Sequence, residues 1–69
     1  MNSYKLARYR AGASVKATAA ATGIGEDAIY RYERGTRTPG AEAAKALADF
    51  YGTTVDVLLG LAEPDQEAA

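Results

Sequence analysis

Apolar residues recur at helical spacing along this 69-residue chain, and glycines divide it into short stretches. In the first stretch, Tyr4, Ala7 and Ala11 recur at i, i+3 and i+7, which places them on one face of a helix. A polar residue at position 2 or 3 can cap its start. Gly12 can end it, because glycine adopts the left-handed C′ position at almost no cost. The pattern predicts a first helix that ends near Ala11.

The next part of the chain predicts two short helices joined by a tight turn. Ser14 is a suitable N-cap for an alanine-rich helix over Val15–Thr22, because its hydroxyl oxygen can accept from an amide of the first turn. Only residues 23–25 (Gly-Ile-Gly) separate this helix from another over Glu26–Arg34, which Gly35 ends. Two helices joined this closely are typical of a helix-turn-helix.

The helix over residues 26–34 has one apolar and one polar side. Ala28, Ile29 and Tyr32 fall on the apolar side and should face the core. The polar side presents Glu26, Asp27, Tyr30, Arg31 and Arg34. The acids lie at the positive end of the helix dipole and Arg34 lies at the negative end, an arrangement that favours this helix.

Two further helices complete an all-α prediction. An apolar stripe predicts a fourth helix over Ala41–Tyr51. The stripe consists of Ala41, Ala44, Leu47, Ala48 and Tyr51. Thr54 can cap a short fifth helix over Val55–Leu59. Leu58 and Leu59 should pack against the first and fourth helices and close the core.

Charge is segregated along the chain, although the net charge is only −1. Residues 1–40 hold seven cationic and three acidic side chains, a net charge of +4, whereas residues 41–69 hold one cation and six acids, a net charge of −5. Such segregation gives one positive face that can approach phosphate, while the acidic end lowers non-specific affinity. The alternative is a solvated surface on which the charges cluster by accident.

Composition narrows the chemistry. The sequence has no cysteine or histidine, which removes disulfides, thiolate metal sites and the commonest general base. Glu26-Asp27 and Asp49 are the nearest approach to paired carboxylates, and no glycine-rich phosphate loop is present. No apolar run is long enough to span a bilayer, and the start lacks the apolar segment of a signal peptide. We expect a cytoplasmic protein that is not an enzyme and holds no metal or cofactor.

Several of these features occur in the same order in one known family. They are Arg8, Gly12, Ser14, Ala19, Gly23, Ile29, Glu33-Arg34-Gly35, Pro39, Leu47-Ala48, Tyr51-Gly52 and residues 54–59. Through them the chain resembles the phage-repressor/Cro (XRE) family of helix-turn-helix DNA-binding domains. The resemblance implies a compact, lambda-repressor-like domain of five helices over residues 1–60, with the helix-turn-helix at the second and third helices. Residues 61–69 remain as an acidic tail that we expect to be disordered.

The resemblance also implies that the third helix lies in the major groove of double-stranded DNA. The base-reading candidates are Glu26, Asp27, Tyr30 and Arg31. Arg31 can form a bidentate pair with guanine, the commonest specific contact. Three interpretations of the two acids remain open. One acid reads cytosine or orients Arg31, both only favour the helix N-terminus, or both belong to a protein interface.

Phosphate contacts are expected from the cations and hydroxyls around that helix. The candidates are Ser14, Lys16, Arg34, Thr36, Arg37 and Thr38. Lys5 or Arg10 can add to them from the first helix. Such contacts fix the register of a protein on DNA without reading its sequence. For each residue, an ordinary exposed side chain is the competing interpretation.

One structural pair follows from the resemblance. In the family, an arginine at the position of Arg8 pairs with the glutamate matched here by Glu33. We therefore predict an Arg8–Glu33 pair that ties the first helix to the third. The alternative is that Arg8 binds phosphate and Glu33 is merely exposed.

The second helix departs from the family pattern. Thr18 and Thr22 stand where the family usually has leucine or valine, which should weaken the core. Their hydroxyls need partners, often the i−4 carbonyl. Val15 stands where the family commonly has a glutamine that reaches DNA, so only its backbone amide can make that contact.

Dimers of this family often form through the C-terminal helix region. A homodimer surface is therefore a candidate role for Phe50, Val57, Leu58 and Leu61, with Phe50 equally able to cover the edge of a small core. We interpret the chain as a small phage or prokaryotic transcription regulator, Cro-like or of the short immunity-repressor type, that acts by operator occupancy. The competing hypothesis is an antitoxin- or anti-repressor-like module of the same fold that binds a protein partner rather than DNA.

Overall fold

The structure is a computed structural model that describes residues 3–62. Its helices are α1 (Tyr4–Arg10), α2 (Val15–Thr22), α3 (Glu26–Arg34), α4 (Ala41–Tyr51) and α5 (Val55–Leu58). No strand occurs in this part of the chain, so the predicted all-α fold is confirmed, as are the bounds of α2, α3 and α4. The tail expected over residues 61–69 falls, from residue 63 on, outside the described residues.

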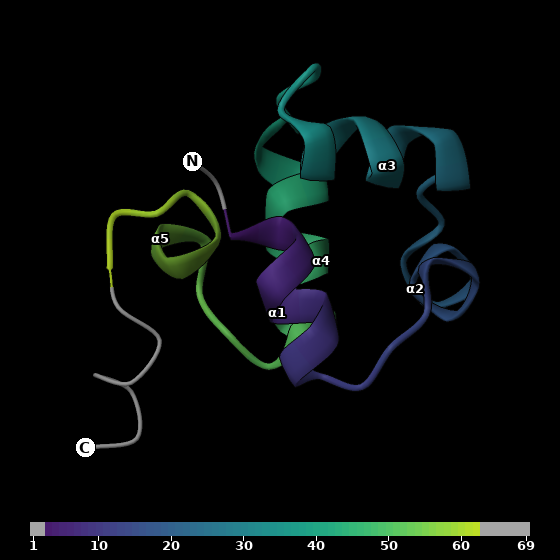
Figure 1. The fold of residues 1–69 in the computed structure, drawn as a ribbon, viewed down its shortest axis with the longest axis horizontal. Coiled ribbons are helices and arrows are strands. Elements are labelled where there is room, and N and C mark those ends of the chain that lie inside the picture. The colour runs from purple at the N-terminus through teal and green to yellow at the C-terminus, as the bar shows by residue number, and fades with distance from the viewer. Residues whose placement is uncertain (1–2, 63–69) are drawn as a thin grey trace.

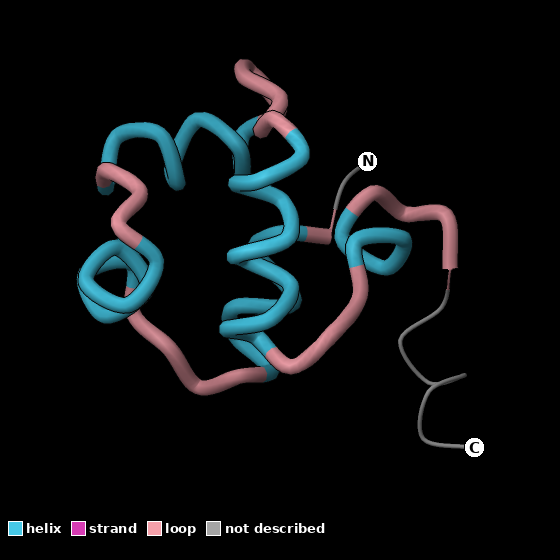
Figure 2. The backbone as a smooth tube through the Cα atoms, turned by 180° about the vertical axis from the view of Figure 1, so that it is seen from behind, coloured by secondary structure: helices cyan, strands magenta, loops and turns pink. Residues whose placement is uncertain are grey.

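Helix α4 lies at the centre of the packing. It packs against α1, α2 and α5, while α3 packs against α1 and α2. Both views place α2 and α5 on opposite sides of the α1–α4 pair, with α3 crossing one end of that pair (Figure 1, Figure 2). Helix α3 is therefore held at the edge of the domain by the helices behind it.

The centre of the core is a cluster of apolar side chains contributed by α1, α3, α4 and α5. Its buried members are Tyr4, Ala7, Tyr32, Leu47, Ala48, Tyr51 and Leu58. The rings of Tyr4 and Tyr32 lie 6.1 Å apart between centroids and join α1 to α3. Ile24 packs against the cluster from the turn between α2 and α3. Burial raises the pKa of Tyr51, while hydrogen bonding to Thr18 acts in the opposite direction.

The two unusual threonines of α2 are accommodated by hydrogen bonds. Thr18 is fully buried, and its hydroxyl donates to the carbonyl of Ser14 at 2.9 Å. The hydroxyl of Thr22 donates to the carbonyl of Thr18 at 2.7 Å, as the i−4 pattern predicts. It also accepts from the amide of Ile24 at 3.2 Å. Thr22 thus satisfies a backbone donor inside the turn of the helix-turn-helix.

Ser14 caps the start of α2 through its side chain. Its Oγ accepts from the amide of Ala17 at 2.9 Å. We expect Ser14→Ala to lower the free energy of unfolding by about 1 kcal/mol, because that amide loses its partner. The control is Ser3→Ala, because Ser3 caps α1 without a side-chain hydrogen bond. Urea denaturation should show a lower midpoint for Ser14→Ala alone, and equal shifts in the two variants would contradict the cap.

Two alanines predicted on buried faces are exposed. Helix α1 ends at Arg10, so Ala11 is its C-cap. Ala41 is the first residue of α4, whose buried stripe begins one turn later at Ala44. In both cases the residue lies at a helix end, where the core no longer covers it.

Helix α5 is shorter than predicted. It ends at Leu58, which is fully buried, whereas Leu59 is 42% exposed and does not close the core. Gly60 adopts a positive φ of 81°, and the amide of Leu61 donates to the carbonyl of Asp56 at 2.8 Å. This closing turn ends the helix after one turn and leaves Leu59 on the surface.

Candidate nucleic-acid interface

The outer face of α3 gathers all the polar side chains that the sequence placed there. Glu26, Asp27, Tyr30, Arg31 and Arg34 are exposed. On the opposite side, Ile29 is 1% and Tyr32 is 5% exposed, and Ala28 packs against the core. The four base-reading candidates therefore share one face of a helix whose other face is anchored.

The two acids at the start of α3 are not hydrogen-bonding caps. Gly25 is the N-cap residue, and no side chain bonds to the first amides there. Within residues 3–62, no ion pair links Glu26 or Asp27 to Arg31. No contact in this structure therefore supports the hypothesis that an acid orients Arg31. The favourable interaction of the acids with the helix dipole does not require a direct contact.

The loop after α3 is fixed at both ends. Gly35, with a φ of 78°, lets the amide of Thr36 donate to the carbonyl of Arg31 at 3.0 Å, and the Thr36 hydroxyl donates to the same carbonyl at 3.3 Å. The guanidinium of Arg37 lies 6.0 Å from the centre of the Tyr32 ring, and Pro39 is buried. The phosphate candidates Thr36, Arg37 and Thr38 are thus exposed on a held loop beside the end of α3.

The start of α2 supplies the other phosphate candidates. Lys16 is exposed, and Ser14 is exposed although its Oγ is engaged as the cap. Val15 is only 6% exposed, so it serves the core at a position where the family often has a polar residue. The start of α2 is the positive end of its helix dipole, although the amide of Ala17 is already bonded to the Ser14 hydroxyl.

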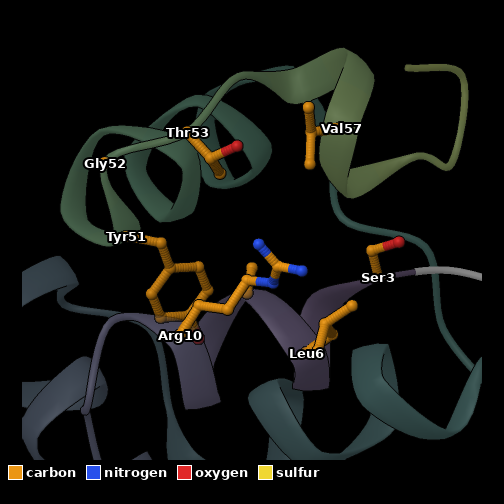
Figure 3. Close-up of a pocket in the computed structure, with 8 residues that line it drawn as sticks. Ser3, Leu6, Arg10, Tyr51, Gly52, Thr53 and Val57 are labelled. Atoms are coloured by element: carbon orange, nitrogen blue, oxygen red, sulfur yellow. The ribbon is translucent and has the colours of Figure 1, made fainter. Parts of the chain in front are cut away.

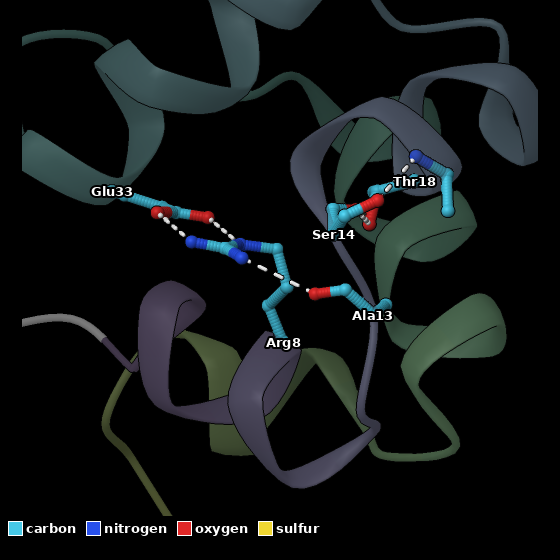
Figure 4. Close-up of polar contacts among 6 residues, drawn as sticks. Arg8, Ala13, Ser14, Thr18 and Glu33 are labelled. Atoms are coloured by element: carbon cyan, nitrogen blue, oxygen red, sulfur yellow. Dashed lines mark hydrogen bonds and ion pairs between the residues drawn. The ribbon is translucent and has the colours of Figure 1, made fainter.

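Arg8 ties α1 to α3, as predicted (Figure 4). Its Nε donates to Oε2 of Glu33 at 2.7 Å and its Nη2 donates to Oε1 at 3.1 Å, with the side chains 10% and 5% exposed. Its Nη1 donates to the carbonyl of Ala13 at 3.2 Å, which also fixes the segment before α2. The hydrogen bond to Glu33 raises the pKa of Arg8, and burial opposes this. The alternative of an exposed Glu33 is wrong.

Comparison with known proteins now identifies the domain. The sequence matches the helix-turn-helix domain family over residues 5–61. The chain belongs to the XRE-type helix-turn-helix family. It is also 42% identical over 55 residues to the HTH-type transcriptional regulator AnsR of Bacillus subtilis (strain 168). That match covers 80% of this chain and 47% of AnsR, so the chain spans about half the length of this relative. No solved structure matches the chain.

Of the four candidate dimer residues of this helix-turn-helix domain, two are exposed and two are buried. Phe50 is 38% and Leu61 is 74% exposed, and the ring of Phe50 lies 5.7 Å from that of Tyr51. Val57 and Leu58 are buried within the monomer, because they are the residues that fix α5 to the core. They offer no exposed contact area to a second copy, whereas Phe50 and Leu61 do.

Sequence reasoning did not single out Tyr9. Its ring is 60% exposed, with the Lys5 ammonium 5.8 Å and the Arg8 guanidinium 5.1 Å from its centre. The signal in the sequence is the i, i+4 spacing of Lys5 and Tyr9 on one helix surface. The Tyr9 ring therefore lies between two cations on the exposed surface of α1.

Within residues 3–62, the structure gives little support for a small-molecule site, a metal site or a membrane-spanning helix. A cavity of about 140 Å³ lies between α1 and the segment around the end of α4, and Arg10 is its one charged side chain (Figure 3). No group of three or more acidic residues within residues 3–62 could hold a metal ion. None of the helices in this range is long and apolar enough to cross a membrane.

Proposed function

We propose that this helix-turn-helix domain binds double-stranded DNA sequence-specifically and regulates transcription by occupying an operator, in the manner of a Cro-like or short immunity-repressor protein. The outer face of α3 is the observation that carries the proposal, because its polar side chains are exposed together while the opposite face is anchored. The family match and the resemblance to a protein named as a transcriptional regulator support DNA-binding regulation.

In the proposed complex, α3 enters the major groove. Arg31 donates two hydrogen bonds to O6 and N7 of a guanine, and Glu26 or Asp27 accepts from N4 of a cytosine. Tyr30 lies beside them and contacts a neighbouring base. The phosphate contacts come from Ser14, Lys16, Arg34, Thr36, Arg37 and Thr38. Two copies of the domain would meet half-sites about one helical turn apart.

A second candidate function is favoured by the acids of α3. Glu26 and Asp27 are adjacent, exposed and without an ion pair among the described residues. Carboxylates at the tip of a recognition helix repel nearby phosphates. The same face would suit a basic patch on a protein partner, as in an antitoxin- or anti-repressor-like module.

Selection from a random DNA library, followed by binding measurements across a salt series, tests the proposal. Wild type should enrich a defined sequence and bind it more tightly than a scrambled duplex, with affinity falling steeply as salt rises. Arg31→Ala should cost about 1–3 kcal/mol on the selected sequence, because one guanine contact is lost, and should relax the preference at that position.

The matched control for this experiment is Lys45→Ala. Lys45 is an exposed cation on α4 that pairs only loosely with Asp49, at 3.4 Å with both side chains mostly exposed. This variant should keep the sequence preference. The absence of any enriched sequence with wild type would overturn the proposal and favour the protein-binding alternative.

A further inference from the structure

A groove lies between α1 and α3 and borders the outer face of α3. It is lined by Lys5, Arg8, Tyr9, Tyr30, Glu33 and Arg34. Three of these side chains are cations and one is a carboxylate, so the groove has a net charge of +2. Because Tyr30 and Arg34 also belong to the outer face of α3, the groove is continuous with the candidate DNA surface.

The groove has a fixed base and accessible walls. Arg8 and Glu33 are paired and mostly buried, which makes them its base. Tyr9 and Tyr30 are 60% and 45% exposed, from α1 and α3 respectively. The ring of Tyr9 holds the Lys5 ammonium 5.8 Å from its centre, a cation–π arrangement that keeps the ammonium beside the groove and leaves its N–H groups accessible.

The structure separates the two cations of α1 that the sequence left equivalent. Lys5 lines the groove beside α3. Arg10 instead lies near Tyr51 and Thr53 in the cavity around the end of α4, which no residue of α3 lines (Figure 3). The two residues have the same charge and lie on the same helix. They differ mainly in the surface on which each side chain lies.

We propose that the α1–α3 groove binds a phosphate of the DNA backbone, with the Lys5 ammonium and the Tyr9 hydroxyl as donors. An ammonium and a phenolic hydroxyl are suitable donors to phosphodiester oxygens, and such contacts position a protein without reading sequence. This makes α1 part of the DNA interface and rests on the proposed function. The paired base contributes a net charge near zero, so the attraction comes from Lys5 and Arg34.

The test compares Lys5→Gln with Arg10→Gln in DNA binding across a salt series. Lys5→Gln should reduce the slope of log affinity against log salt by about 0.9, and weaken binding about 5- to 10-fold at about 0.1 M salt, because one phosphate contact is lost. The loss should be equal on selected and scrambled duplexes. Arg10→Gln should leave the slope unchanged although it removes the same charge.

A second experiment changes the DNA. A duplex with one neutral methylphosphonate at the contacted phosphate should be bound less tightly by wild type but not by Lys5→Gln.

The outcomes separate this inference from the proposed function. If wild type prefers a sequence but Lys5→Gln behaves like Arg10→Gln, the groove proposal is overturned while sequence-specific binding stands. If wild type has no preference yet Lys5→Gln loses slope, the groove binds phosphate and the proposed function fails. Saturable binding of inorganic phosphate near Tyr9 and Tyr30, followed by NMR, together with an unchanged DNA slope, would assign the groove to a free anion and overturn the proposal.

Discussion

Arg8→Ala is expected to lower the free energy of unfolding by about 3–5 kcal/mol, because it leaves the nearly buried carboxylate of Glu33 without its partner. It also removes the donor to the carbonyl of Ala13. At roughly 0.05–0.15 kcal/mol of stability per residue, a domain of this size has about 3–10 kcal/mol in total. The variant should therefore be unfolded at room temperature if the total lies at the low end of this range, and folded with a much lower urea midpoint if it lies at the high end. Far-UV circular dichroism with urea denaturation would measure either result.

A double replacement distinguishes the stability lost when Glu33 has no partner from the net contribution of the ion pair to the free energy of unfolding. Arg8→Met combined with Glu33→Leu should recover most of the stability, since apolar side chains of similar size avoid the cost of burying two charges. Lys45→Ala, which removes an exposed pair with Asp49, should change stability by less than about 1 kcal/mol. If Arg8→Ala costs no more than Lys45→Ala, the pair is not buried in solution.

The fold followed closely from local signals in the sequence. Gly23 and Gly35 end α2 and α3 with positive φ, and the cap at Ser14 forms as expected, because each signal acts within a few residues. The errors lie at helix ends, at Ala11, Ala41 and Leu59, where a shift of one residue moves a side chain off the buried face.

The candidate site was less accessible to sequence reasoning. Arg8 and Glu33 are 25 residues apart, so their pairing was predicted from the family resemblance and not from spacing. Which cation of α1 lies beside α3 depends on how the two helices pack, and the sequence left Lys5 and Arg10 equivalent. The base-reading roles of the α3 residues stay predictions, because they depend on the nucleic acid as well as on the helix.

Leu58→Ala should be as damaging as breaking the buried pair, with an expected loss of about 3–5 kcal/mol. Leu58 is fully buried in the core cluster and belongs to a helix of four residues, which cannot persist without such an anchor. Its backbone carbonyl also accepts from the amide of Ser3 at 3.1 Å, so loosening α5 would release the segment before α1. Urea denaturation should show a much lower midpoint.

Leu59→Ala is the matched control, because it changes the same residue type one position later. Leu59 is 42% exposed, so its replacement should cost about 1 kcal/mol or less. The pair of variants thus measures burial while the chemistry and the place in the chain stay nearly constant. If both variants lose equal stability, Leu59 is covered in solution. A midpoint that depends on protein concentration would then identify a second copy of the chain as the cover, whereas a midpoint independent of concentration would place Leu59 in the monomer core.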